Sequence, residues 1–204
     1  DVLQVASHSF YPDGGNTLAK SYTLDFWTYL TDVATTQTFI GFRIDGTAWL
    51  RYVNKVNASD SSLGQIRVQE KYAGSLNIDI TDTSATITAN AWHHIAIIYD
   101  AVNSKMSMWI DGTRKINNVT IPDHGMTSGA SCYIGGLTAS DNLIQGGYID
   151  SLRWSQGVLR YAHTDATITV PTQIYGAYKD KTIPTITFTG QLASGSLASD
   201  EDIE

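Results

Sequence analysis

The chain has 204 residues, of which 42% are hydrophobic and 16% are charged, and its formal net charge is −7. This length fits one sandwich-sized domain, and the apolar share can form a core, which argues against disorder. The negative charge and the lack of a basic run argue against a nucleic-acid partner. No apolar stretch approaches the roughly 20 residues of a membrane span, so we expect no membrane insertion.

The first half of the chain predicts short strands separated by turns. In residues 22–30, Leu24 and Phe26 alternate with Asp25 and Trp27, as in a strand with two different faces. A polar loop is predicted at 54–64, and Asp45 with Gly46 forms a strong hairpin signal. Further strands are predicted at 38–44, 48–53, 65–72 and 76–80, and residues 86–88 lead to the segment at 92–100.

The middle of the chain reads Trp-His-His-Ile-Ala-Ile-Ile-Tyr-Asp over residues 92–100. Ile95 and Ile97 face one way and Ala96 and Ile98 the other, and both sets are apolar. We therefore expect a central strand that is covered on both sides. A turn, a second strand at 106–110 and an Asp-Gly turn follow.

The last part of the body predicts strands at 113–119, 132–135 and 148–154, a helical turn at 156–161, and edge strands at 167–171 and 175–178. Alternation in 148–154 places Asp150 on one face with Tyr148, Leu152 and Trp154, so we expect it to accept hydrogen bonds from backbone N–H groups.

Strands recur every 8–12 residues without a fixed repeat or a helical period, which predicts an all-β fold of two antiparallel sheets. The sandwich domain is assigned to residues 1–178. Residues 179–204 are interpreted as a C-terminal extension, with a strand at 184–189 and an acidic Gly/Ser-rich tail. The extension is either an interaction arm that adds to a neighbouring chain by edge pairing or a linker to a further domain.

Three blocks carry a family resemblance: Tyr22-Thr-Leu-Asp-Phe-Trp, the hairpin at 92–111, and Tyr133-Ile-Gly-Gly followed by residues 147–161. Together they resemble the concanavalin A-like lectin/glucanase superfamily, and in particular its laminin-G-like jelly-roll domains. The third block is similar to versions found in bacteriophage virion proteins. The resemblance implies a jelly-roll sandwich that acts as a virion structural or attachment module, as a tail-fibre or capsid-decoration protein. The alternative is a bacterial extracellular lectin-like adhesion module.

Enzymatic activity is not expected. Glucanases of this superfamily carry a cluster of acidic residues on one strand, whereas the only glutamates here are Glu70, Glu201 and Glu204. Glu70 is interpreted as a solvated strand residue. His93 and His94 are adjacent in a strand and point to opposite faces, so they are not expected to share a metal.

Calcium binding is left open, with no ligand set assigned. Many members of the superfamily hold Ca²⁺ at the rim with aspartates and carbonyls, and this chain has aspartates in predicted loops, but turn formation explains nearly all of them. These are Asp13, Asp60, Asp82, Asp123 and Asp141. The single cysteine, Cys132, precedes an apolar run and is expected to be a buried small hydrophobic residue.

Glycan binding requires an exposed aromatic ring that can stack on a sugar. The candidates are Trp49, Tyr52, Tyr72 and Trp109, although Trp109 could also lie in a second layer. The expected partners are other virion proteins, a cell-surface glycan and further copies of the chain. The expected location is the virion surface, or alternatively the bacterial cell surface or the extracellular space. The chain opens at Asp1 without a visible signal peptide, as a processed or partial chain would.

Overall fold

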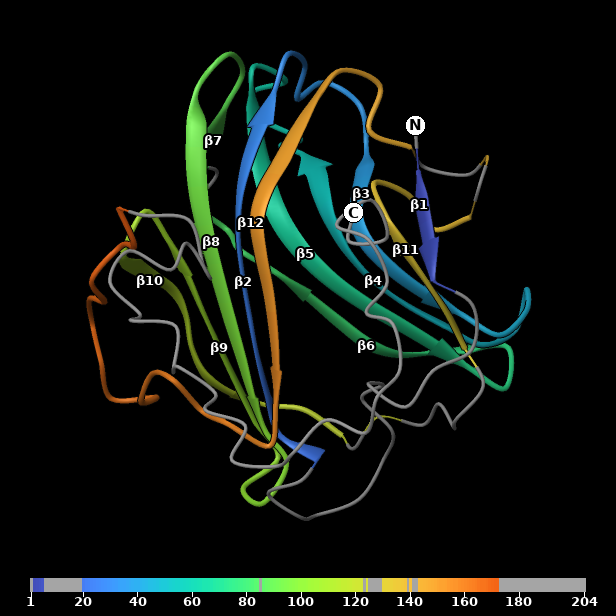
Figure 1. Ribbon diagram of the computed structural model, residues 1–204, viewed down its shortest axis with the longest axis vertical. Coiled ribbons are helices and arrows are strands. Elements are labelled where there is room, and N and C mark those ends of the chain that lie inside the picture. Colours follow the sequence, from blue (N-terminus) through green and yellow to red (C-terminus); the bar gives the residue numbers. More distant parts are fainter. Residues whose placement is uncertain are drawn as a thin grey trace, which may run out of the picture.

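The computed structural model describes residues 2–5, 20–84, 86–122, 124, 130–138, 140 and 143–172. Within this part of the chain, twelve strands form two antiparallel sheets that face each other, and no α-helix is present (Figure 1). No helix among these residues is long and apolar enough to cross a membrane. The predicted all-β sandwich of two sheets is confirmed.

The larger sheet contains, in spatial order, β1 (Leu3–Val5), β11 (Ser131–Ile134), β3 (Gln37–Arg43), β4 (Trp49–Val56), β5 (Leu63–Tyr72) and β6 (Ser75–Thr81), and β7 (Ile87–Thr88) pairs with β5. The smaller sheet has the order β10 (Thr113–Thr120), β9 (Lys105–Ile110), β8 (Trp92–Asp100), β2 (Tyr22–Leu30) and β12 (Gly147–Gln156). The two terminal strands β1 and β12 lie at the edges of different sheets.

The facing sides of the sheets form the main core. Leu24 and Phe26 of β2 are fully buried there, and the ring of Phe26 lies 5.3 Å from that of Phe39 on the opposite sheet. The alternation predicted for β2 is therefore confirmed. The prediction for residues 92–100 is also confirmed, because β8 is the middle strand of its sheet and is buried from His93 onward.

The outer side of the smaller sheet has a second, smaller core, which residues 157–170 cover. We call these residues the covering segment. Ala96, Ile98 and Trp109 pack against Leu159, Tyr161 and Ile168 of this segment. The segment contains no helical turn, so that prediction is wrong: β12 continues to Gln156, and a left-handed residue, Gly157, follows.

The remaining edge predictions have mixed outcomes. Residues 167–171 form no strand and make only an isolated bridge between Thr167 and Thr113. The strands predicted at 175–178 and 184–189 lie outside the described residues, as does the whole assigned extension 179–204. Cys132 is a free, buried cysteine, as expected.

Candidate functional site

Three aromatic side chains lie in one row across the outer face of the smaller sheet, at its end. Tyr29 of β2 is paired in register with Trp92 of β8 on one side and with Tyr148 of β12 on the other. The ring centroid of Tyr29 lies 5.6 Å from that of Trp92 and 6.0 Å from that of Tyr148. We call this set the aromatic row.

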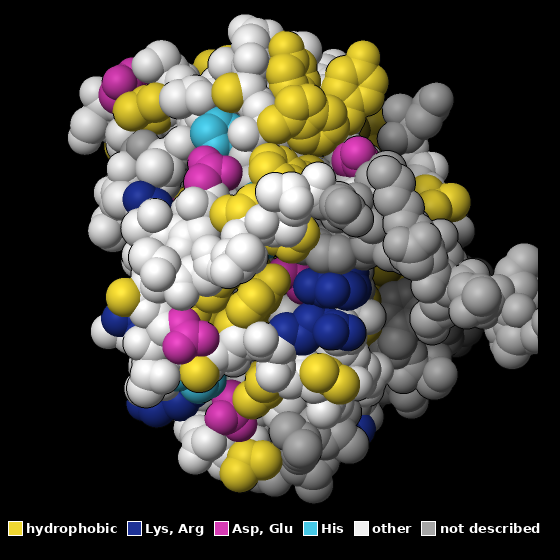
Figure 2. Space-filling view, turned by 60° about the vertical axis from the view of Figure 1, so that its left-hand side comes forward, with side chains coloured by type: hydrophobic (Ala, Val, Ile, Leu, Met, Phe, Trp, Pro, Cys, Tyr) yellow, Lys and Arg dark blue, Asp and Glu magenta, His cyan; other side chains and the backbone are white. Residues whose placement is uncertain are grey.

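The aromatic row is open to solvent. Trp92 is 46% exposed and Tyr148 is 66% exposed, although both are large apolar rings. Their ring planes are within 29° of each other, at a centroid separation of 6.4 Å. Hydrophobic side chains gather at the upper end of this face in Figure 2. Exposed aromatic groups of this kind mark surfaces that bind a ligand or a partner.

A hollow of about 460 Å³ lies beside the aromatic row. Trp27 and Trp92 line one part of it, and Asp150 with Ser151 of β12 supplies polar groups. The end of the described chain completes the lining with Val170, Pro171 and Thr172. The site therefore combines aromatic faces with a carboxylate and a hydroxyl, which is the usual chemistry of a small-ligand site.

Asp150 lines this hollow immediately before a β-bulge in β12. The register of β12 against β2 shifts between Asp150 and Arg153, and Ser151 has a positive φ of 50°. The exposed carboxylate of Asp150 accepts the backbone N–H of Ser151 at 2.6 Å. The expectation that Asp150 shares a face with Leu152 and Trp154 is wrong, because the bulge turns those two side chains into the core.

A buried carboxylate, that of Asp25, lies on the same strand as Trp27, which lines the hollow. Asp25 is fully buried and accepts hydrogen bonds from Arg153 at 3.0 and 3.2 Å and from the Tyr161 hydroxyl at 2.6 Å. His94 lies 3.8 Å from the same carboxylate and stacks obliquely with Trp27, at 5.4 Å. Burial lowers the pKa of His94, and the attraction of Asp25 only partly offsets this.

Two of the four aromatic residues predicted to bind glycan are inaccessible. Tyr52 faces the main core and donates its hydroxyl to that of Tyr22 at 2.6 Å. Trp109 faces outward but lies under the covering segment, where its indole N–H donates to the carbonyl of Asp165 at 2.9 Å. Both predictions are wrong, because neither ring reaches solvent. The alternative placement of Trp109, in a second layer, is the one that the structure shows.

The other two aromatic predictions remain predictions. Trp49 is half-buried, and the guanidinium of Arg51 lies 4.8 Å from its ring centroid, so part of that ring is already covered. Tyr72 is 42% exposed at the end of β5. Neither residue belongs to the aromatic row.

The sequence reasoning missed Tyr29, Trp92 and Tyr148 as site residues. Alternation in β2 did place Tyr29 and Trp27 on the face away from the core. The signal that could have found the row is the occurrence of outward-facing aromatic residues at the ends of three strands. Their convergence depends on strand order, which a single sequence does not contain.

Glu70 is not a solvated residue, contrary to the prediction. Its side chain is fully buried, accepts a hydrogen bond from the amide of Asn77 at 2.9 Å, and lies 3.4 Å from His124 Nδ1. Asp60 and Asp82 bond to Ser62 and Ser84, two residues further on, as turn-forming aspartates do.

No group of three or more His, Cys, Asp or Glu residues among those described is placed to hold a metal ion. Asp13, Asp123 and Asp141 lie outside the described residues.

The model of the concanavalin A-like lectin/glucanases superfamily, in its laminin-G form, matches residues 4–163. The chain belongs to this superfamily. A comparison with curated proteins finds no match.

Solved structures share the fold. Domain 4 of AbnA, an extracellular arabinanase from Geobacillus stearothermophilus solved with arabinotriose, is 22% identical; the match covers 72% of this chain and 65% of that one, with a TM-score of 0.52. The enzymatically active domain of tailspike protein 2 from bacteriophage CBA120 is 12% identical over 76% of this chain and 24% of that one, also with a TM-score of 0.52.

A heptameric pentraxin from Limulus polyphemus matches with a TM-score of 0.46 and 14% identity, over 66% of this chain and 63% of the pentraxin. The match thus spans less than two thirds of both the pentraxin and the arabinanase domain. At these identities the likeness concerns the lectin-like jelly-roll fold.

Proposed function

We propose that this domain binds carbohydrate at the aromatic row, without catalysis, and serves as an attachment module. The observation that carries the proposal is the exposed pair Trp92 and Tyr148 next to a hollow that contains the Asp150 carboxylate. Aromatic rings offer a flat apolar face for the C–H side of a sugar ring, and a carboxylate accepts hydrogen bonds from its hydroxyl groups. Membership of a lectin-like superfamily supports the same ligand class.

The buried position of Glu70 supports a non-catalytic role. Retaining glycoside hydrolysis needs two carboxyl groups about 5 Å apart on either side of the scissile bond. Glu70 is buried and has no access to a substrate. Asp25 is also buried, and it accepts hydrogen bonds from Arg153 and Tyr161. Incubation with oligosaccharides should therefore release no reducing ends, and release above a buffer control would contradict this part of the proposal.

The decisive experiment compares Trp92→Ala and Tyr148→Ala with the unchanged chain on a glycan array and by calorimetric titration. Leu76→Ala is the control, because Leu76 is an exposed apolar residue on β6 of the larger sheet, outside the row. Tyr72→Ala tests the remaining sequence prediction separately. We expect each row variant to weaken binding at least about tenfold, which corresponds to about 1.4 kcal/mol, because each removes an aromatic face from the site. Retention of full affinity by Trp92→Ala would overturn the proposed site.

We place this attachment role on a virion surface, in a tail fibre or a capsid decoration. The resemblance of residues 133–161 to virion proteins supports this setting, and the shared fold with a phage tailspike domain is compatible with it. The competing setting is a bacterial extracellular adhesion module. Immunogold labelling with an antibody against the domain distinguishes the virion setting from the bacterial setting, because only the virion setting predicts label on purified virus particles.

A further inference from the structure

The carboxylate of Asp150 keeps one oxygen available in the hollow beside the aromatic row. Its Oδ1 accepts the backbone N–H of Ser151 at 2.6 Å and the Ser151 hydroxyl at 3.3 Å. Oδ2 has no hydrogen-bond partner among the described residues, and the side chain is exposed. An ionised carboxylate accepts hydrogen bonds and donates none. The hollow therefore presents an acceptor that suits a ligand hydroxyl and opposes a ligand anion.

No cation offsets this charge within the described lining of the hollow, which contains neither lysine nor arginine. Arg153, two residues after Ser151 on β12, donates two hydrogen bonds to the buried carboxylate of Asp25. The Nε of Arg160 donates to the Ser155 hydroxyl at 2.8 Å. Both guanidinium groups are thus engaged within the protein, and the chain as a whole carries a formal net charge of −7.

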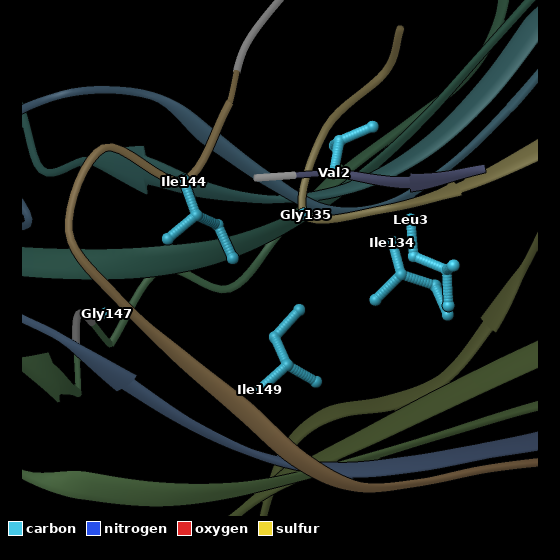
Figure 3. A pocket seen from close by; sticks show the side chains of 7 residues that line it. All are labelled: Val2, Leu3, Ile134, Gly135, Ile144, Gly147 and Ile149. Atoms are coloured by element: carbon cyan, nitrogen blue, oxygen red, sulfur yellow. The ribbon is translucent and has the colours of Figure 1, made fainter. Parts of the chain in front are cut away.

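A second hollow, of about 380 Å³, has a different chemistry. Its lining consists of two glycines and the aliphatic side chains of Val2, Leu3, Ile134, Ile144 and Ile149, and Figure 3 shows only carbon atoms in those side chains. Sugar hydroxyls placed there would lose their hydrogen bonds to water without gaining a side-chain partner. Of the two hollows, the one that contains Asp150 is therefore the one that can read the charge of a sugar.

We propose that the hollow beside the aromatic row takes uncharged hexose units and discriminates against sugars that carry a carboxylate. This inference rests on the proposed carbohydrate binding and names the ligand class of the same site. A neutral sugar donates a hydroxyl to Oδ2 of Asp150 in a charge-assisted hydrogen bond. A uronate meets a like charge instead, and the repulsion is stronger beside the apolar rings of Trp27 and Trp92 than in bulk water, because the local dielectric constant is lower.

Matched pairs of ligands test the discrimination in the full chain. Oligosaccharides derived from cellulose, mannan and galactan are printed on an array beside the same oligosaccharides after oxidation of their C6 hydroxymethyl groups to carboxylates. Calorimetric titration at low salt then measures the affinity for both members of each pair that gives a signal. We expect oxidation to weaken binding at least about tenfold, and we expect added salt to narrow this difference, because ions screen the repulsion.

The variant Asp150→Asn removes the charge and keeps an oxygen that can accept the Ser151 N–H. It should bind the oxidised oligosaccharides at least about fivefold more tightly than the unchanged chain does, and the neutral ones more weakly. Asp45→Asn is the control with the same change in net charge. Asp45 is exposed in the turn between β3 and β4, and its Oδ1 accepts hydrogen bonds from Thr47 and Ala48, as an amide oxygen also can. The control should keep the original preference.

Equal affinity for the neutral and oxidised forms, or tighter binding of the oxidised form, would overturn this inference and leave the proposed carbohydrate binding intact. An unchanged preference in Asp150→Asn would also overturn it, because the discrimination would then come from another group. Absence of binding to every oligosaccharide on the array would instead count against the proposed function itself, and the inference would fall with it.

Discussion

The Nδ1 atom of His93 lies 2.7 Å from one carboxylate oxygen of Asp111, whose other oxygen accepts the backbone N–H of His94 at 2.8 Å. The N–H of Thr88 donates to Nε2 of His93 at 3.1 Å, so the ring proton lies on Nδ1. Asp111 and Gly112 have φ values of 50° and 77°, as in a tight hairpin turn. His93 thus connects the start of β8 to the β9–β10 turn through its hydrogen bond with Asp111.

Asp111→Ala should lower the free energy of unfolding by about 1–3 kcal/mol, because it leaves His93 and the N–H of His94 without their charged acceptor. Burial raises the pKa of Asp111, but the hydrogen bonds from His93 and the His94 N–H outweigh this, and the pKa lies below its usual value. Asp111→Asn keeps an acceptor and should lose less. Urea denaturation measures the free energy of unfolding of both variants. An alanine variant as stable as the unchanged chain would refute the stabilising role of Asp111.

Stability should fall as the pH drops below about 6.5 because of His94. Its pKa is lowered in the folded state, chiefly by burial, so the unfolded chain binds the proton more readily. The free energy of unfolding then decreases from the unfolded pKa down to the folded pKa, by at most about 1.4 kcal/mol per pH unit for one histidine. His163 acts in the same direction, since burial also lowers its pKa.

Denaturation curves between pH 7.5 and 5 check this dependence. His94→Gln should flatten the curve relative to the unchanged chain. A variant that retains the full slope would show that other groups cause it.

Cys132 should be inert toward thiol reagents in the folded protein. Burial raises its pKa to about 12, and a thiolate is the reactive form. At pH 8 we expect no reaction with Ellman's reagent over minutes, and one equivalent after addition of guanidinium. Rapid stoichiometric labelling without denaturant would contradict the buried position.

Gly147→Ala should destabilise the fold by several times the effect of Gly74→Ala. Both glycines have positive φ, 142° and 82°, but a Cβ at Gly147 would lie 2.1 Å from the carbonyl oxygen of Tyr29, whereas nothing lies within 4 Å at Gly74. We expect about 1 kcal/mol for Gly74→Ala from its left-handed backbone alone. Thermal unfolding compares the two, and similar shifts in melting temperature would argue against the close contact.

Much of the fold follows from local patterns in the sequence. The alternation in β2 and the two apolar faces of β8 predicted which side chains enter the core, because both strands are regular over their whole length. The same reasoning failed at Asp150, because a bulge at Ser151 interrupts the alternation, and serine carries no obvious signal for a positive φ.

The candidate site was harder to predict for a different reason. Trp109 faces outward, as a ligand-binding residue would, but a segment about 50 residues later covers it. Glu70 has an ionisable side chain, yet it lies inside the core, where it contacts Asn77 and His124. In both cases solvent access is set by a tertiary neighbour. The aromatic row likewise exists only because β8, β2 and β12 are adjacent.

The bulge at Ser151 divides β12 into two parts with separate tasks. Before it, Tyr148 and Asp150 face solvent, and after it Leu152 and Trp154 fill the core. Substitutions at the first two positions therefore leave the interior volume unchanged. Under the proposed function, ligand preference can diverge among related proteins at one end of this strand while the other end keeps the scaffold constant, so that new specificities arise without a new fold.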